Sequence, residues 1–179
     1  MRIICGKYGK RRFSIPKNFR ARPTTDFAKE NVFNVLENFI DWETLNALDL
    51  FSGTGSIGFE LLSRGCKRVV SIEKNANHYA FIKKTAKELN DPNFFSIKGD
   101  AFTYIENASD QFDLIFADPP YDLPELKQIP ELIFQSALLN MGGIFILEHP
   151  KAYSFSEHAY FLQHRAYGSV NFTLFQKPE

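Results

Sequence analysis

The apolar positions of the chain form two alternating kinds of segment. Short continuous apolar runs bounded by turn residues are typical of buried parallel strands, and longer stretches with apolar residues every three or four positions are typical of helices. The runs predict strands at 46–51, 68–73, 94–97, 112–117 and 143–148. The intervening stretches predict helices near 56–65, 76–90, 101–108 and 125–139. This alternation predicts an α/β fold with a doubly wound, mainly parallel, Rossmann-like sheet.

The two ends of the chain depart from this alternation. A helix is predicted before the first strand, with Thr24 to Asp26 as candidate caps, because apolar residues recur there at helical spacing: Ala28, Val32, Val35, Leu36 and Phe39. At the other end, residues 161–166 and 170–175 alternate like strands and are joined across Tyr167-Gly168-Ser169. They predict an antiparallel hairpin that brings the sheet to seven strands.

Length and composition favour a single domain over residues 1–179, since 44% of the residues are hydrophobic and the chain shows no repeat. Residues 26–179 form the expected catalytic core. No apolar run approaches the ~20 residues of a membrane span, and Cys5 and Cys66 are too few and too far apart to indicate a disulfide framework or a metal site. We therefore expect a cytoplasmic protein with reduced thiols and no metal or membrane partner.

A formal net charge of zero hides a strong asymmetry. Residues 1–30 hold nine Lys or Arg against two acidic residues, a net +7, so the remainder carries −7. Such a basic block favours a polyanionic partner, although a solvated tail would have the same composition. Ile3, Ile4, Phe13 and Ile15 interleave with these charges and indicate short strands that fold onto the body. Residues 1–25 are thus predicted to be a basic extension that contacts a polyanion.

Three glycines follow the first predicted strand at the spacing Gly53-x-Gly55-x-x-Gly58. Glycine here permits a tight turn, close approach of the backbone to a ligand, and close packing of helix on strand. Glu73 lies 20 residues after Gly53, at the end of the next strand, where its carboxylate can accept ribose hydroxyl hydrogens. A dinucleotide site or a plain turn would show the same glycines. Asp49 favours S-adenosylmethionine instead, because its carboxylate repels pyrophosphate but suits a sulfonium and an amino group.

A second motif, Asp118-Pro119-Pro120-Tyr121, ends the predicted strand 112–117. The two prolines hold the chain extended with exposed carbonyls, and open sheets bind ligands at this edge. The Asp118 carboxylate and the Pro119 carbonyl can accept the hydrogens of a planar amine while Tyr121 stacks on its ring. The alternative is an ordinary strand-ending turn.

The whole chain resembles the bacterial 16S ribosomal RNA guanine-N2 methyltransferases of the RsmD type. The resemblance rests on seven segments: Met1-Arg2-Ile3-Ile4-Cys5-Gly6-Lys7, Arg22-Pro23-Thr24-Thr25-Asp26, residues 49–58, Gly99-Asp100-Ala101, residues 118–121, Glu148-His149-Pro150 and Arg165-Ala166-Tyr167-Gly168. One departure is that Phe27-Ala28 stand where the family often has an arginine, so no RNA contact is assigned there.

The resemblance implies a class I methyltransferase acting on 16S ribosomal RNA or the assembling small subunit. It implies that S-adenosylmethionine is bound by Asp49, Phe51, Gly53, Gly55, Gly58, Glu73, Asp100 and Ala101. The target amine is assigned to Asp118, Pro119, Pro120 and Tyr121, and RNA to Arg2, Lys7, Lys10, Arg11, Arg12, Arg20 and Arg22. Asp100 would contact the adenine of S-adenosylmethionine or simply cap a helix. His149 would contact the substrate or be structural.

Three other classes of function remain open. The motif of residues 118–121 also suits adenine N6 or a protein amide, although 179 residues leave no room for a separate DNA-reading domain. A nicotinamide oxidoreductase is disfavoured by Asp49 and the terminal hairpin. A non-catalytic RNA-binding protein is disfavoured by the intact motif.

Overall fold

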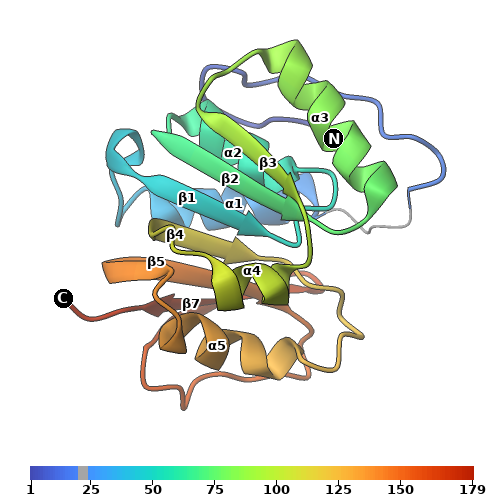
Figure 1. Ribbon diagram of the computed structural model, residues 1–179. Helices are drawn as coiled ribbons and strands as arrows, with labels where there is room; N and C mark the ends of the chain where they lie inside the picture. The colour runs from blue at the N-terminus through green and yellow to red at the C-terminus, as the bar shows by residue number, and fades with distance from the viewer. Residues whose placement is uncertain (20–23) are drawn as a thin grey trace.

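The computed structural model describes residues 1–19 and 24–179, and the predicted RNA contacts Arg20 and Arg22 lie outside them. A seven-stranded sheet with the order β3-β2-β1-β4-β5-β7-β6 forms the centre of the molecule (Figure 1). Its strands are β1 (Asn46–Leu50), β2 (Arg68–Glu73), β3 (Phe94–Lys98), β4 (Phe112–Ala117), β5 (Leu139–His149), β6 (Phe161–Tyr167) and β7 (Val170–Gln176). The first five are parallel, and β7 pairs antiparallel with both β5 and β6. The predicted sheet and hairpin are therefore confirmed.

In the part of the chain that the structure describes, five α-helices cover both faces of this sheet. The helices α1 (Asp26–Leu36), α2 (Ser56–Arg64) and α3 (Ala76–Leu89) share one apolar core with the sheet, and α4 (Ala101–Asn107) and α5 (Ile129–Gln135) share the other. Successive strand residues feed opposite cores, as with Ala47 and Leu48 in β1. A strand covered on both faces has no solvent side, which explains the continuous apolar runs of the sequence.

Three elements differ from the prediction by more than one residue at a boundary. In place of the helix predicted at 125–139, the structure has a 3₁₀ turn at Leu126–Gln128 followed by the shorter helix α5. Pro130 lacks the N–H group that a helix interior needs, so it lies in the first turn of α5. β5 consequently begins at Leu139 rather than at 143. α1 ends at Leu36, so Phe39 lies beyond it and is exposed.

The basic extension packs on the body as predicted. Ile3 is fully buried and Phe13 nearly so, both in the core shared with α1 and α2. Instead of the predicted short strands, the extension forms a turn closed by an isolated bridge between Arg2 and Arg12. Ile4 and Cys5 donate their backbone N–H groups to the Glu60 carboxylate of α2, at 2.8 and 3.1 Å. The extension is thus tied to the helix that follows the glycine turn.

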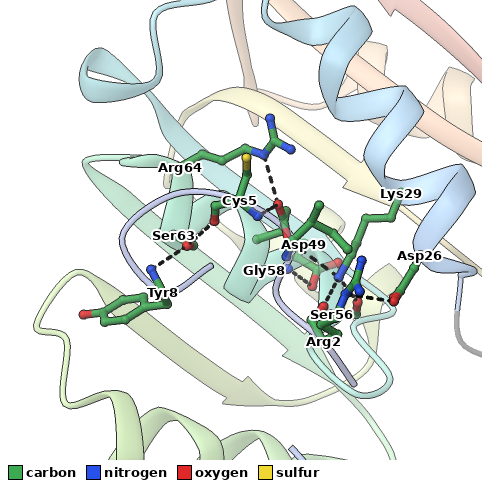
Figure 2. A network of polar contacts seen from close by, with 12 residues as sticks. Arg2, Cys5, Tyr8, Asp26, Lys29, Asp49, Ser56, Gly58, Ser63 and Arg64 are labelled. Carbon is green, nitrogen blue, oxygen red and sulfur yellow. Dashed lines mark hydrogen bonds and ion pairs between the residues drawn. The ribbon is translucent and has the colours of Figure 1, made fainter. Parts of the chain in front are cut away.

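A buried ion pair lies under this extension (Figure 2). The Lys29 ammonium is 3.6 Å from the Glu60 carboxylate, and neither side chain is exposed. The same ammonium donates to the Arg2 carbonyl at 2.5 Å and to Ser56 Oγ at 2.9 Å. Burial lowers the pKa of Lys29 even though Glu60 opposes the shift. Lys29 therefore belongs to the internal anchor, and its charge is not available to an external polyanion.

Candidate active site

A cavity of about 870 Å³ lies at the carboxyl ends of the parallel strands. It spans this edge because β1 is flanked by β2 on one side and β4 on the other, the arrangement at which doubly wound sheets bind ligands. Glu73 ends β2 and Asp118 follows β4, and these two strands are separated by β1, so the strands lie roughly 10 Å apart. The wall includes Thr25, Phe51, Gly53, Thr54, Ile72, Glu73, Lys74, His78, Asp100, Ala101, Phe102, residues 118–121, Glu148 and Val170.

The glycine turn forms the floor of this cavity. Gly53 and Gly55 have φ angles of 56° and 77°, in the left-handed region that favours glycine. A Cβ on Gly58 would lie 2.3 Å from Ser71 Oγ, so only glycine allows α2 to approach β2 this closely. Of the three predicted glycines, Gly53 lines the cavity, whereas Gly55 and Gly58 shape the turn from behind.

The Glu73 carboxylate is fixed in position by the backbone. Gly53 N–H donates to its Oε2 at 2.6 Å, and Asn75 N–H donates to its Oε1 at 2.7 Å. Each carboxylate oxygen keeps a lone pair after these bonds, and the residue lies on the cavity wall. The arrangement suits a group that presents two hydroxyl hydrogens.

An apolar slot adjoins Glu73. Phe51, with a φ of 59°, meets Phe102 edge to face at a ring distance of 5.8 Å, and Ala101 lies beside them. Asp100 caps α4 by accepting the N–H groups of Phe102 and Thr103. Although partial burial opposes the shift, Lys74 at 3.0 Å and these donors lower the pKa of Asp100. Asp100 is thus a helix cap on the cavity wall, and its contact with adenine stays a prediction.

Asp49 lies beneath the turn rather than on the cavity wall. Its Oδ2 accepts the N–H of Gly58 at 3.0 Å, and its buried Oδ1 has no hydrogen-bond partner. Burial raises the pKa of Asp49 to about 7. A cation in the cavity would favour the ionised form through the field of the carboxylate. The predicted preference for a cationic donor therefore rests on the charge of Asp49 beneath the turn, not on a contact at the wall.

The motif of residues 118–121 joins a cluster of polar groups at the other end of the cavity. Thr24 Oγ1 lies 3.1 Å from Asp118 Oδ2 and 2.8 Å from Glu148 Oε2, and Tyr121 donates its hydroxyl hydrogen to Glu148 Oε1 at 2.8 Å. Two carboxyl groups thus share one hydroxyl in a place where little water reaches. Burial first, and the charge of Glu148 second, raise the pKa of Asp118 well above its usual range.

Because the pKa of Asp118 is raised, the contribution of this residue to the free energy of unfolding depends on pH. An acid whose pKa is higher in the folded than in the unfolded protein binds more protons when folded, so stability falls as pH rises from the unfolded pKa through the folded one. We expect Asp118→Asn to melt at a higher temperature than the wild type at pH 8, by roughly 2–4 °C for each kcal/mol of repulsion removed. The gain should vanish near pH 3.5. Scanning calorimetry across pH checks this, and a pH-independent difference would contradict it.

Two members of this cluster were not predicted as site residues. Thr24 was considered only as a helix cap, but Thr25 fills that position by accepting the N–H of Ala28. Glu148 lies at the end of β5, 30 residues from Asp118 in the chain. It reaches Asp118 because β4 and β5 are neighbours. The sequence signal was present, since both residues belong to the quoted resemblance segments.

His149 is structural. It is fully buried, and its ring nitrogens lie 3.0 Å from the Pro150 carbonyl and 2.8 Å from Thr173 Oγ1. The carbonyl can only accept, so Nδ1 carries the hydrogen and Nε2 accepts from the threonine. Burial lowers the pKa of His149, which keeps the ring neutral.

The predicted RNA-binding side chains are of two kinds. Arg2 and Lys7 form ion pairs with Asp26 and Asp91, at 3.1 and 2.5 Å, whereas three further basic side chains are exposed: Lys10, Arg11 and Arg12. At the departure noted in the sequence, Ala28 is buried in the core, but Phe27 is 64% exposed and meets Tyr167 edge to face.

Within residues 1–19 and 24–179, no three His, Cys, Asp or Glu side chains gather as metal ligands would. The helices of that same part of the chain are too short or too polar to cross a membrane.

Comparisons with known proteins agree with this geometry. A family profile described as conserved hypothetical protein 95 matches residues 1–176. The chain is 30% identical over 148 residues to the ribosomal RNA small subunit methyltransferase D of Buchnera aphidicola, a match covering 83% of this chain and 75% of that protein.

Solved structures extend the comparison to the cofactor. A putative methylase from Haemophilus influenzae superposes with a TM-score of 0.80 at 28% identity, over 99% of this chain and 98% of that one. A putative methyltransferase complexed with S-adenosylhomocysteine shares the fold at 16% identity and a TM-score of 0.67, over 83% of this chain and 49% of that one. The cavity, the fixed Glu73 carboxylate and the buried acidic group under the turn fit such a cofactor. The chain therefore belongs to the RsmD-like family of S-adenosylmethionine-dependent methyltransferases.

Proposed function

We propose that this methyltransferase modifies the exocyclic N2 amine of a guanine in 16S ribosomal RNA. The observation that carries the proposal is the Thr24–Asp118–Glu148–Tyr121 cluster, which gathers hydrogen-bond acceptors at the end of the cofactor cavity. Acceptors in this place suit a substrate that presents N–H donors. The ribosomal RNA named for a relative at 30% identity supports the choice of polymer.

The residues around Asp118 address the weakness of an aromatic amine as a nucleophile. Its lone pair is delocalised into the ring, so the amine must be turned before it can react. Asp118 and the Pro119 carbonyl accept its two hydrogens and direct the lone pair toward the cofactor end of the cavity. When bound, S-adenosylmethionine supplies an electrophilic methyl group there.

Positive charge develops on the amine nitrogen as it takes the methyl group from the donor sulfur, and the charge is removed when the nitrogen releases one hydrogen as a proton, which the Asp118 carboxylate can accept. The carboxylate and the carbonyl stabilise that charge, because they are already oriented in a site that excludes most water. Tyr121, whose hydroxyl is held by Glu148, provides a ring on which the base stacks. The base must be unpaired or turned out of its stack to reach this position.

The exposed part of the basic extension is assigned to the phosphates that flank the target. We expect replacement of Lys10, Arg11 and Arg12 together by glutamine to weaken RNA binding and to flatten its dependence on salt. Each lost phosphate contact should lower the slope of log affinity against log salt by about 0.7 to 0.9. Filter binding of small-subunit RNA at several salt concentrations measures this.

A matched control removes the same charge elsewhere. Lys83, Lys84 and Lys87 are exposed on α3, outside the extension. If the assignment holds, joint replacement of these three lysines by glutamine changes the salt dependence of RNA affinity less than replacement of Lys10, Arg11 and Arg12 does. Both triple variants keep their affinity for S-adenosylmethionine. An unaltered slope in a folded variant of the extension would remove these three residues from the RNA site.

The polymer is tested by methyl transfer to mixed substrates. The protein is incubated with labelled S-adenosylmethionine and small ribosomal subunits from a strain lacking the corresponding enzyme, alongside free ribosomal RNA and DNA. The proposal expects label in 16S RNA at one guanosine, located by primer extension or mass spectrometry of fragments. Label confined to ribosomal proteins or DNA would instead support the protein-amide or adenine alternatives.

A further inference from the structure

Two acceptor groups of the cluster face the cavity side by side. Asp118 and Glu148 both line the wall, at the ends of the neighbouring strands β4 and β5, and Thr24 Oγ1 is within 3.1 Å of an oxygen of each. Only one of them is needed to orient an amine. In the mechanism proposed above, Glu148 holds the Tyr121 hydroxyl but is assigned no contact with the base.

The Watson–Crick edge of guanine offers two neighbouring donors, the N1–H and the N2 amine. The corresponding edge of adenine, with its N6 amine, presents an acceptor at N1. A pair of acceptors set side by side therefore matches guanine, whereas it places an oxygen against the N1 lone pair of adenine. Buried polar groups left unpaired in this way are the strongest source of discrimination between similar bases.

We propose that Glu148 accepts the N1–H of the target guanine while Asp118 accepts a hydrogen of its N2 amine, so that the pair selects guanine. The inference rests on the proposed function. Thr24 and Tyr121 hold the Glu148 oxygens at 2.8 Å and so fix their direction toward the base. Mutual repulsion, which contributes to the raised pKa of Asp118, is relieved when two N–H donors arrive.

The test compares two bases at the mapped guanosine position, in RNA assembled by ligation. 2-Aminopurine keeps the N2 amine but presents an acceptor at N1. For the wild type we expect kcat/KM to fall about 10- to 100-fold on this substitution, the cost of opposing a charged acceptor with a lone pair. In Glu148→Gln, an amide N–H can donate to N1, and the preference for guanine should shrink to within about threefold.

2-Aminopurine also lacks the O6 oxygen of guanine. The wild type and Glu148→Gln lose this contact alike, so its effect cancels when their preferences for guanine over 2-aminopurine are compared. Tyr121→Phe is the matched control, because it removes a hydrogen bond to Glu148 but keeps the carboxylate, so it should slow both substrates and retain the preference. Unchanged affinity of Glu148→Gln for S-adenosylmethionine by calorimetry shows that the cavity is folded.

Two results would overturn the proposal: a wild type that methylates both bases equally, or a Glu148→Gln variant that is slowed by the same factor on both. The measurement on the wild type tests the proposal even if the Glu148→Gln variant does not fold. Failure to methylate any guanosine would reject the proposed function instead, so the two failures are distinct.

Discussion

Replacing Asp118 by alanine is expected to abolish most methyl transfer while leaving the affinity for S-adenosylmethionine nearly unchanged. Turnover should fall at least about 100-fold, the usual cost of removing a preorganised group that faces developing charge. The reason is positional, since Asp118 follows β4 next to Glu148 and Thr24, whereas Glu73 and the apolar slot beside it lie toward β2 and β3. Single-turnover kinetics and calorimetry on the same preparation measure the two quantities.

Asp122 provides the matched control. It is an exposed carboxylate four residues along the same loop, so Asp122→Ala changes the net charge equally without touching the cluster. We expect near wild-type turnover for it. If both variants were equally slow, or if Asp118→Ala lost donor affinity in proportion to turnover, the assignment of Asp118 to the target amine would be wrong.

The second large effect is expected at Glu73. Glu73→Gln should weaken binding of S-adenosylmethionine by about 1–3 kcal/mol, or roughly 5- to 150-fold in Kd, because a charged acceptor of the ribose hydroxyls is lost. The glutamine retains the size of the side chain and one acceptor for the N–H of Gly53 or Asn75, so the turn keeps much of its support. Saturating donor should restore much of the turnover.

Titration calorimetry with S-adenosylmethionine and its demethylated product measures this loss, and a parallel titration with NAD should give no saturable heat. A control at Glu106, which is exposed on α4, should bind both ligands like the wild type. If Glu73→Gln bound the donor normally but could not turn it over, the two carboxylates would have their roles reversed.

The architecture was predictable because the central parallel strands β1, β2 and β4 are covered on both faces. That burial requires a continuous apolar run, and the runs at 68–73 and 112–117 match β2 and β4 residue for residue. The helix before β5 was harder. Its apolar content continued the helical pattern past Ser136. Pro130 set where the helix could begin, and pairing of Leu139 with Phe112 of β4 set where the next strand begins.

Some residues of the candidate site could likewise be predicted from the sequence, and others could not. The glycine turn, Glu73 and the motif of residues 118–121 were predictable because each is a local sequence with its own chemistry. Thr24 and Glu148 were not predictable as partners of Asp118, because 94 residues separate Thr24 from it and only the strand order and the placement of α1 unite them. The burial of Lys29 against Glu60 was also hidden, since both residues have the sequence character of exposed helix positions.

The most direct test of the central claim is the identity of the methylated nucleoside. Small subunits modified by the wild-type protein are digested to nucleosides and analysed by mass spectrometry against standards, with Asp118→Ala as the inactive reference. The account predicts N2-methylguanosine, formed by the wild type and absent with Asp118→Ala. N6-methyladenosine in its place, or subunit RNA left without any new methylated base, would contradict it.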